Sequence, residues 1–175
     1  LSDGRSEFWA PAAQAETVLP TLTAQLREAP LNDWLLAQVR AGIGQVFGAT
    51  REQLIPQMIN LQAVGGVSFK KGCYTGQEIV ARMQYLGKLK RRLYRLSLAG
   101  DAVPAVATPL FSPVHGSSVG EVVLAARSSS GVELLAVVQE DALVDGHLHL
   151  GSLEGPALQR LDLPYTLDAD REIQR

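Results

Sequence analysis

The residue types best suited to covalent chemistry in this sequence cluster around its single cysteine, Cys73. Lys70 and Lys71 precede it, and Thr75 and Glu78 follow at the spacing of a capping box, which predicts a helix beginning just after the cysteine. Neighbouring cations and the positive end of a helix dipole favour the thiolate over the thiol. The pattern predicts a reactive or ligand-donating cysteine; the alternative is a buried structural one, because free cysteines are often buried.

Positive charge is concentrated in the same part of the chain. Residues 70–95 contain eight basic residues and one acidic residue, whereas residues 96–175 contain four basic and eleven acidic residues. Such a cluster attracts a polyanion or the anionic tail of a cofactor. The alternative is a solvated strand face whose charges keep a sheet edge from pairing with another chain.

The first half of the chain has mainly helical periodicity. Apolar spacings of three and four predict a helix over residues 12–27, bent at Pro20. A second helix is predicted to be capped by Asn32 or Asp33 and to end at Gly42. Three further segments are expected to be extended: residues 7–9, 44–47 and 66–69.

Beyond residue 88 the pattern changes to short strands separated by clusters of Pro, Gly and Ser. Strands are predicted over residues 91–98, 120–126, 132–139 and 147–150. Strands at this spacing are typical of a small sandwich or barrel. The predicted fold class is therefore α+β, with an α+β domain over residues 1–87 and an all-β domain over residues 88–175.

Length and composition narrow the class of protein. The chain has 175 residues, 46% of them hydrophobic, which is enough for a buried core. Its apolar runs, such as residues 134–138, are far shorter than the roughly 20 residues that cross a bilayer. One cysteine excludes an intrachain disulfide, and the N-terminus resembles no secretory leader, so we expect a cytoplasmic protein with no membrane partner. The first residue is Leu1 rather than Met, and we expect a piece of a longer polypeptide.

The segment around the cysteine resembles a known signature. Residues 71–78 read KGCYTGQE and Arg82 follows, which is similar to the K-G-C-Y-x-G-Q-E-x-x-x-R signature of the YgfZ family of folate-binding proteins. That family is related to the T-protein, the aminomethyltransferase of the glycine cleavage system. Three other segments resemble the family in the same order: residues 29–34 (APLNDW), 40–43 (RAGI) and 55–61 (IPQMINL).

The resemblance implies a fold and a function. It implies a pocket for tetrahydrofolate or a folate derivative at the junction of ferredoxin-like halves, followed by a C-terminal antiparallel β-barrel. The family is associated with making or maintaining iron–sulfur enzymes, including those that modify tRNA, in the bacterial cytoplasm. We therefore expect folate as ligand, iron–sulfur enzymes as clients and a monomeric chain.

The resemblance also implies roles for particular residues. It places Lys71 and Cys73 at the reacting position, and Trp34, Gln77 and Arg82 against the folate. A flat pterin stacks on an aromatic ring with about 0.5–1.5 kcal/mol beyond burial, and its anionic glutamate tail suits a cation. The alternative for Trp34 is core packing on an amphipathic helix. Family members are longer, and their second folate-contacting tryptophan lies in the half that has no counterpart here.

Three functions follow from these observations. The first is a folate-binding accessory protein without conventional turnover, in which Cys73 acts in thiol or cluster-related chemistry. The second is a folate-dependent aminomethyltransferase, a one-carbon transferase, although T-proteins do not usually carry cysteine at this position. The third is an RNA-binding module on the basic strand of residues 88–95. Strand alternation places Lys90 and Arg92 on one face and Arg91 and Arg95 on the other, which leaves no single continuous basic face and weakens this function. Direct contact with tRNA stays an open alternative.

His147 and His149 form the remaining constellation. One residue separates them on a predicted strand, so both rings face the same side, as two metal ligands do. No third ligand is evident in the sequence. We expect a surface histidine pair and predict no metal site.

Overall fold

The computed structural model describes residues 4–87, 89–144 and 146–167. Within these residues, three α-helices, four 3₁₀ turns and six strands follow one another: η1 (Ala12–Gln14), α1 (Ala15–Thr23), α2 (Leu31–Arg40), η2 (Gly48–Thr50), η3 (Pro56–Ile59), α3 (Gln77–Tyr85), β1 (Arg91–Leu98), β2 (Pro109–Phe111), β3 (Gly120–Ser128), β4 (Gly131–Gln139), η4 (Asp141–Leu143), β5 (Leu148–Leu150) and β6 (Ala157–Leu161). The chain is therefore α+β, with its helices before its strands.

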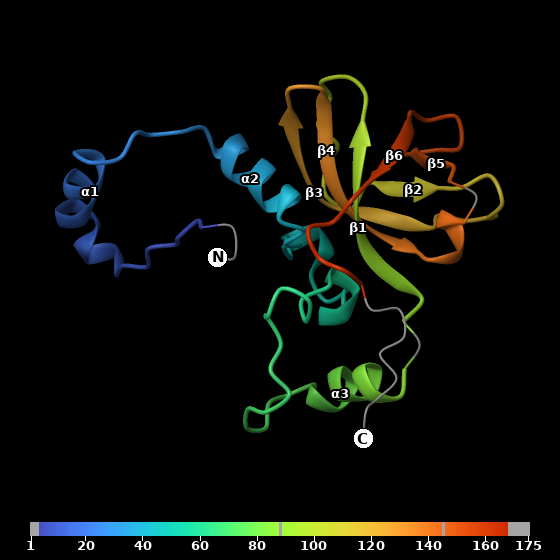
Figure 1. Ribbon diagram of the computed structural model, residues 1–175, viewed down its shortest axis with the longest axis horizontal. Helices are drawn as coiled ribbons and strands as arrows, with labels where there is room; N and C mark the ends of the chain where they lie inside the picture. The colour runs from blue at the N-terminus through green and yellow to red at the C-terminus, as the bar shows by residue number, and fades with distance from the viewer. Residues whose placement is uncertain (1–3, 88, 145, 168–175) are drawn as a thin grey trace.

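The six strands form a closed antiparallel barrel in the order β1-β4-β3-β2-β5-β6 (Figure 1). The long strands β1 and β4 pair along their whole length, with Leu96 opposite Leu134. Strands β1, β3, β4 and β5 confirm the four strands predicted from the sequence. The barrel has two further strands, β2 and β6, which close it and which the sequence pattern did not reveal.

Strands β3 and β4 are buried on both faces. Their inward side chains join those of β1 in the barrel interior, where Leu96, Val122 and Leu134 are inaccessible to solvent. Their outward side chains form a second core with Val39 of α2 and Ile59 of η3. Burial on two faces explains why these strands read as nearly continuous apolar runs, since neither face meets water.

Helix α2 is fixed to the barrel by a side chain that mimics a peptide group. The Asn32 Nδ2 donates to the Arg127 carbonyl of β3 at 3.0 Å, and the Arg127 N–H donates to Asn32 Oδ1 at 2.9 Å. The predicted capping role of Asn32 or Asp33 is wrong, because the helix begins at Leu31 after Pro30 and no side chain caps it. Asn32 instead satisfies both backbone groups of a residue at the end of β3.

The predicted end of α2 at Gly42 is confirmed. Gly42 adopts φ +67° just after the C-cap, and the Ile43 N–H donates to the Gln38 carbonyl at 3.1 Å, as in a Schellman motif. A Cβ at this position would lie 2.7 Å from Cε1 of Tyr165, so close packing also favours glycine. The Tyr165 hydroxyl donates to the Gly42 carbonyl at 2.7 Å, which ties the segment after β6 to the end of α2.

A buried carboxylate links α2 to two strands. Glu133 of β4 accepts hydrogen bonds from Arg40 of α2 at 2.8 Å and from Arg95 of β1 at 2.6 Å, and its side chain is 8% exposed. Burial alone would raise the pKa of Glu133, but the hydrogen bonds from both arginines outweigh it and hold that pKa below its ordinary value. The charged form of Glu133 is therefore the form that stabilises the fold.

The segments before the barrel form helices, turns and loops. No strand lies among residues 4–87, so the three segments expected to be extended do not enter a sheet. Helix α1 has no buried residue and stands away from the barrel in Figure 1. The domain boundary between residues 87 and 88 stays a prediction, and α2 and η3 share a core with the barrel strands. Within the described ranges, no helix has the length and apolar character needed to cross a membrane.

The Glu133 contacts generate a prediction. Glu133→Gln removes the charge that both arginines face, and we expect the free energy of unfolding at pH 7 to fall by about 1–3 kcal/mol. Because folding lowers the pKa of Glu133, its stabilisation is present above the ordinary value of 4.5 and is lost as the pH falls through the folded-state value. Urea unfolding between pH 3 and 7 should therefore show the variant and the wild type converging at low pH.

The matched control for this measurement is Glu52→Gln, because Glu52 lies in an exposed ion pair with Arg51 at 3.5 Å. We expect the control to change stability by less than about 0.5 kcal/mol. Equal stability losses in the two variants at pH 7, or a loss at Glu133 that does not change with pH, would contradict a stabilising Glu133 carboxylate.

Candidate functional site

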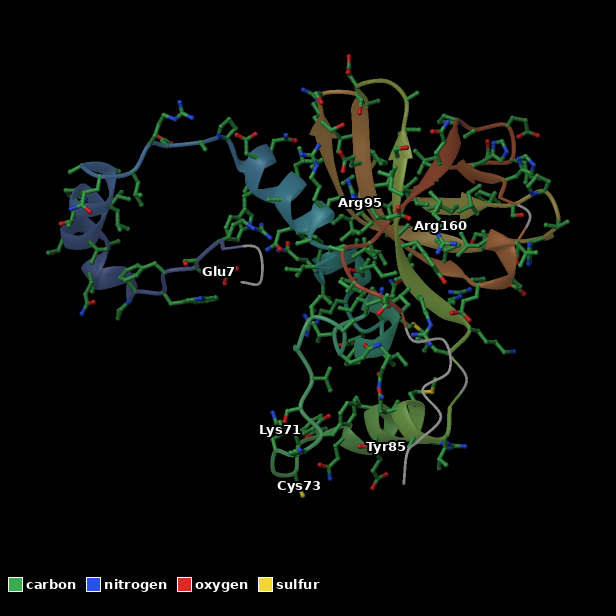
Figure 2. The ribbon with its side chains drawn as sticks, in the orientation of Figure 1. Glu7, Lys71, Cys73, Tyr85, Arg95 and Arg160 are labelled. Atoms are coloured by element: carbon green, nitrogen blue, oxygen red, sulfur yellow. The ribbon has the colours of Figure 1, made fainter. Side chains whose placement is uncertain are left out.

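Cys73 lies on a loop that projects from the body of the molecule. Figure 2 shows Cys73 and Lys71 at the tip of this loop, beyond α3 and away from the barrel. The thiol is free and exposed, and residues 68–73 are all exposed. The alternative of a buried structural cysteine is therefore wrong, and the sulfur is accessible to a reactant.

The helix after the cysteine begins as predicted, but by a different device. The N-cap of α3 is Gly76 with φ +85°, and no side chain caps the helix. The predicted capping box between Thr75 and Glu78 is wrong, because a left-handed glycine turns the chain into the helix. In its place the Tyr74 N–H donates to Gln77 Oε1 at 3.2 Å. Gln77, predicted to contact folate, here holds the loop against the first turn.

Two further contacts, both with aromatic rings, order the loop. The rings of Phe69 and Tyr85 meet edge to face with centroids 5.7 Å apart, which joins the loop to the last turn of α3. The Lys71 ammonium lies 4.9 Å from the centre of the Tyr74 ring, a cation–π contact within the loop. Arg82, the other predicted cation, is exposed on α3.

Trp34 lies on a different part of the molecule, the first turn of α2. The Arg5 guanidinium lies over its ring, 4.8 Å from the centroid, and donates to the Trp34 carbonyl at 3.5 Å and to Gln38 Oε1 at 3.4 Å. An open pocket of about 660 Å³ extends from this ring, within the size range of ligand sites. Its lining also includes Pro30 and Asp33.

The structure thus separates the predicted site residues into two groups. Trp34 belongs to the pocket on α2, whereas Lys71, Cys73 and Arg82 belong to the loop and α3, which lies apart from α2 (Figures 1 and 2). Arg5 was missed from the sequence, because a lone arginine in an irregular segment gives no sign of the ring it will cover. A single site built from both groups stays a prediction.

Unpartnered carboxamides lie on the segment between the two groups. Gln57 Oε1, Asn60 Oδ1 and Gln62 Oε1 are buried and accept no hydrogen bond from the described residues. The amide nitrogen of Gln57 donates to the Val80 carbonyl of α3 at 2.6 Å, and that of Asn60 donates to the Leu93 carbonyl at 2.8 Å. Sequence reasoning missed these acceptors because their burial depends on distant partners.

Two cations of the basic strand are neutralised by carboxylates of the barrel. Arg92 pairs with Glu140 at 2.8 Å, and Arg95 pairs with Glu133. These ion pairs weaken the reading of residues 88–95 as an RNA-binding strand, since paired arginines offer less charge to phosphates. Residue 88 lies outside the described residues.

The histidine pair is explained by local structure. His149 Nδ1 lies 2.9 Å from the Gly155 carbonyl oxygen and closes the turn between β5 and β6. His147 is exposed just before β5. Among the described residues, no group of three or more His, Cys, Asp or Glu side chains is arranged to hold a metal ion.

Comparison with known proteins gives one consistent result. The chain is 35% identical over 160 residues to a protein from Edwardsiella ictaluri, covering 90% of this chain and 48% of the relative. It is 36% identical over 159 residues to a protein from Escherichia fergusonii, covering 87% of this chain and 49% of the relative. It is 36% identical over 146 residues to a protein from Klebsiella pneumoniae, covering 81% of this chain and 45% of the relative.

All three relatives carry the name tRNA-modifying protein YgfZ. The chain spans about half the length of these relatives. No family model matches the chain. The similarity confirms the family resemblance first seen around the cysteine, and it extends that resemblance through most of the barrel.

Proposed function

Because the chain is a homologue of the YgfZ proteins over about half their length, we propose that it is a folate-binding accessory protein that supports iron–sulfur enzymes and, through them, tRNA modification. The observation that carries the proposal is the exposed, free Cys73 at the tip of the KGCYTGQE loop. This observation supports the proposal because it places a residue of the family signature where a client protein or a reactant has access to it. In this proposal, residues before the barrel contribute to a folate-binding domain of the T-protein type, with its ferredoxin-like half.

The pocket beside Trp34 supports the folate part of the proposal. The pocket is open to solvent, and the half-buried indole offers a flat apolar surface on which a pterin could stack. Arg5 lies over the ring, so a pterin that stacks there would displace its guanidinium to the edge, where it would face the anionic glutamate tail. Tetrahydrofolate would supply the one-carbon unit or the redox-active pterin.

The carboxamide oxygens near η3 provide a second kind of support. A reduced pterin carries amine and amide N–H donors, and these complement acceptors such as Asn60 Oδ1 and Gln57 Oε1. Buried unpaired acceptors cost free energy, so a donor that reached them would bind favourably.

The chemistry of Cys73 supports an accessory role without conventional turnover. Lys71 is held over Tyr74, and no described side chain is hydrogen-bonded to the thiol as a general base. Cysteine is intrinsically nucleophilic and ligates metals as the thiolate without such a partner. Cys73 therefore acts by presenting a sulfur to an iron–sulfur client, with Lys71 keeping the loop cationic.

Tetrahydrofolate binding tests the proposed pocket. Trp9 is 86% exposed and Trp34 is half-buried, so Trp9→Phe leaves one reporter beside the pocket. We expect saturable quenching of this reporter by tetrahydrofolate. Calorimetry should show Trp34→Ala weakening binding by about 2- to 13-fold, the equivalent of about 0.5–1.5 kcal/mol of stacking. A Trp34→Ala variant that melts like the wild type and binds with unchanged affinity would remove this ring from the site.

Cellular tRNA modification tests the role of Cys73. In bacteria that lack their own copy, we expect Cys73→Ser to reduce methylthiolated tRNA and iron–sulfur enzyme activity toward the level of the deletion. The reason is that serine preserves size and exposure but has no nucleophilic thiolate. Ser68→Ala, at an exposed position of the same loop, is the matched control, with mass spectrometry of digested tRNA as the measurement. Normal methylthiolation in Cys73→Ser at equal protein level would show that the thiol is dispensable.

A further inference from the structure

The cations of this protein fall into two classes. Some are neutralised within the fold, as Arg92 is by Glu140 and Arg95 by Glu133. Those of the loop and α3 are not, because Lys70 and Arg82 are exposed and no carboxylate in the described part of the chain pairs with them. Unpaired positive charge is therefore available beside α3, and also at Lys90 and Arg91, which pair with no carboxylate in the described part of the chain.

Aromatic rings lie among these cations. We define the loop–α3 face as Phe69, Lys70, Lys71, Tyr74, Arg82 and Tyr85. Phe69 is 38% exposed and Tyr85 is 48% exposed, and their rings touch edge to face. Arg82 precedes Tyr85 by three residues on α3, so both side chains share one face of the helix. Figure 2 shows Lys71 and Tyr85 on the part of the molecule that projects from the barrel.

We propose that the loop–α3 face binds single-stranded RNA. Unpaired cations beside exposed rings are the elements of single-strand binding surfaces, in which phosphates meet Lys and Arg while unstacked bases stack on aromatic side chains. Lys70 and Arg82 would contact phosphates, and the Phe69–Tyr85 pair would stack a base. The choice of RNA as the polyanion rests on the proposed role in tRNA modification, and the face itself rests on charge and ring exposure.

An acidic protein is the competing partner. Ile79 is 59% exposed and Leu86 is 84% exposed beside the same face, and a protein interface would bury both. The loop–α3 face favours RNA because two of its rings have a cation next to them: Lys71 lies over the half-buried Tyr74 ring, and Arg82 lies one turn from the exposed Tyr85. The two partners use different residues, so substitutions separate them.

The test is fluorescence anisotropy of a labelled, unstructured 12-nucleotide RNA titrated with the whole chain. A length of about 12 nucleotides is chosen because it lies within the site sizes of single-strand binding surfaces. We expect binding that weakens with salt by about 0.7 in log–log slope for each phosphate contact. Lys70→Gln/Arg82→Gln should lower that slope by about 1.4. Tyr85→Ala should weaken binding by about 5- to 150-fold, whereas Tyr85→Phe, which keeps the ring, should retain it.

The controls decide between partners and between proposals. The double variant Arg27→Gln/Arg51→Gln removes two exposed cations outside the loop–α3 face. The double variant Ile79→Ser/Leu86→Ser removes the exposed aliphatic residues that a protein partner would bury. We expect both variants to bind RNA like the wild type. Three results would overturn the assignment. The first is no RNA binding at low salt, and the second is a loss of RNA affinity in the Arg27/Arg51 control equal to that in the Lys70/Arg82 variant. The third is displacement of the RNA by an equally charged glutamate peptide. Tetrahydrofolate calorimetry on the same wild-type sample shows whether the proposed function survives that outcome.

Discussion

The ion pairs of Glu133 position much of this structure. A carboxylate that is nearly removed from water must be paired, and here it is paired twice, with Arg40 of α2 and with Arg95 of β1. Its position on the outer side of β4 therefore sets where α2 ends against the barrel. From that point Gly42 turns the chain toward η3, and the carboxamide of Gln57 connects η3 to α3. Helix α3, which carries Gln77 and Arg82, is connected to the barrel through this sequence of contacts.

The strength of these connections decreases toward the loop. Helix α2 is held by Glu133, by the paired hydrogen bonds of Asn32 and by the apolar residues around Val39. Helix α3 is attached mainly by one buried residue, Val80, and the hydrogen bond to its carbonyl. Few buried contacts imply low local stability, which suits a segment that must adapt to a partner. A firm barrel thus presents a loosely attached loop with an accessible thiol.

The sequence predicted what depends on local pattern. The bounds of β1 and the end of α2 at Gly42 follow from alternation and from the left-handed preference of glycine, and both are confirmed. β2 was missed because it has three residues and begins with proline, and β6 because it has only two leucines in five positions. These strands exist because the barrel needs partners for β3 and β1, which is a property of the whole fold.

The errors at the helix starts and in the site share one cause. Asn32 looks like a cap, but its amide pairs with Arg127, 95 residues away in the sequence. Thr75 and Glu78 have the spacing of a capping box, but Gly76 makes the turn. The signature residues could be found because they are contiguous, whereas Arg5 and the carboxamide acceptors owe their places to tertiary contacts. Sequence patterns identify residues by their neighbours along the chain, whereas the residues of this site are positioned by contacts between segments far apart in the sequence.

Native-state hydrogen exchange followed by NMR tests most directly whether α2 and the barrel form one unit. The amide of Val39 in α2 and the amides of Leu134 in β4 and Leu96 in β1 should exchange with the same free energy of opening, that of global unfolding. The amide of Val80 in α3 should exchange with a much smaller free energy. Exchange of Val39 as fast as that of Val80, with the strand amides still protected, would contradict the central role given to the Glu133 contacts.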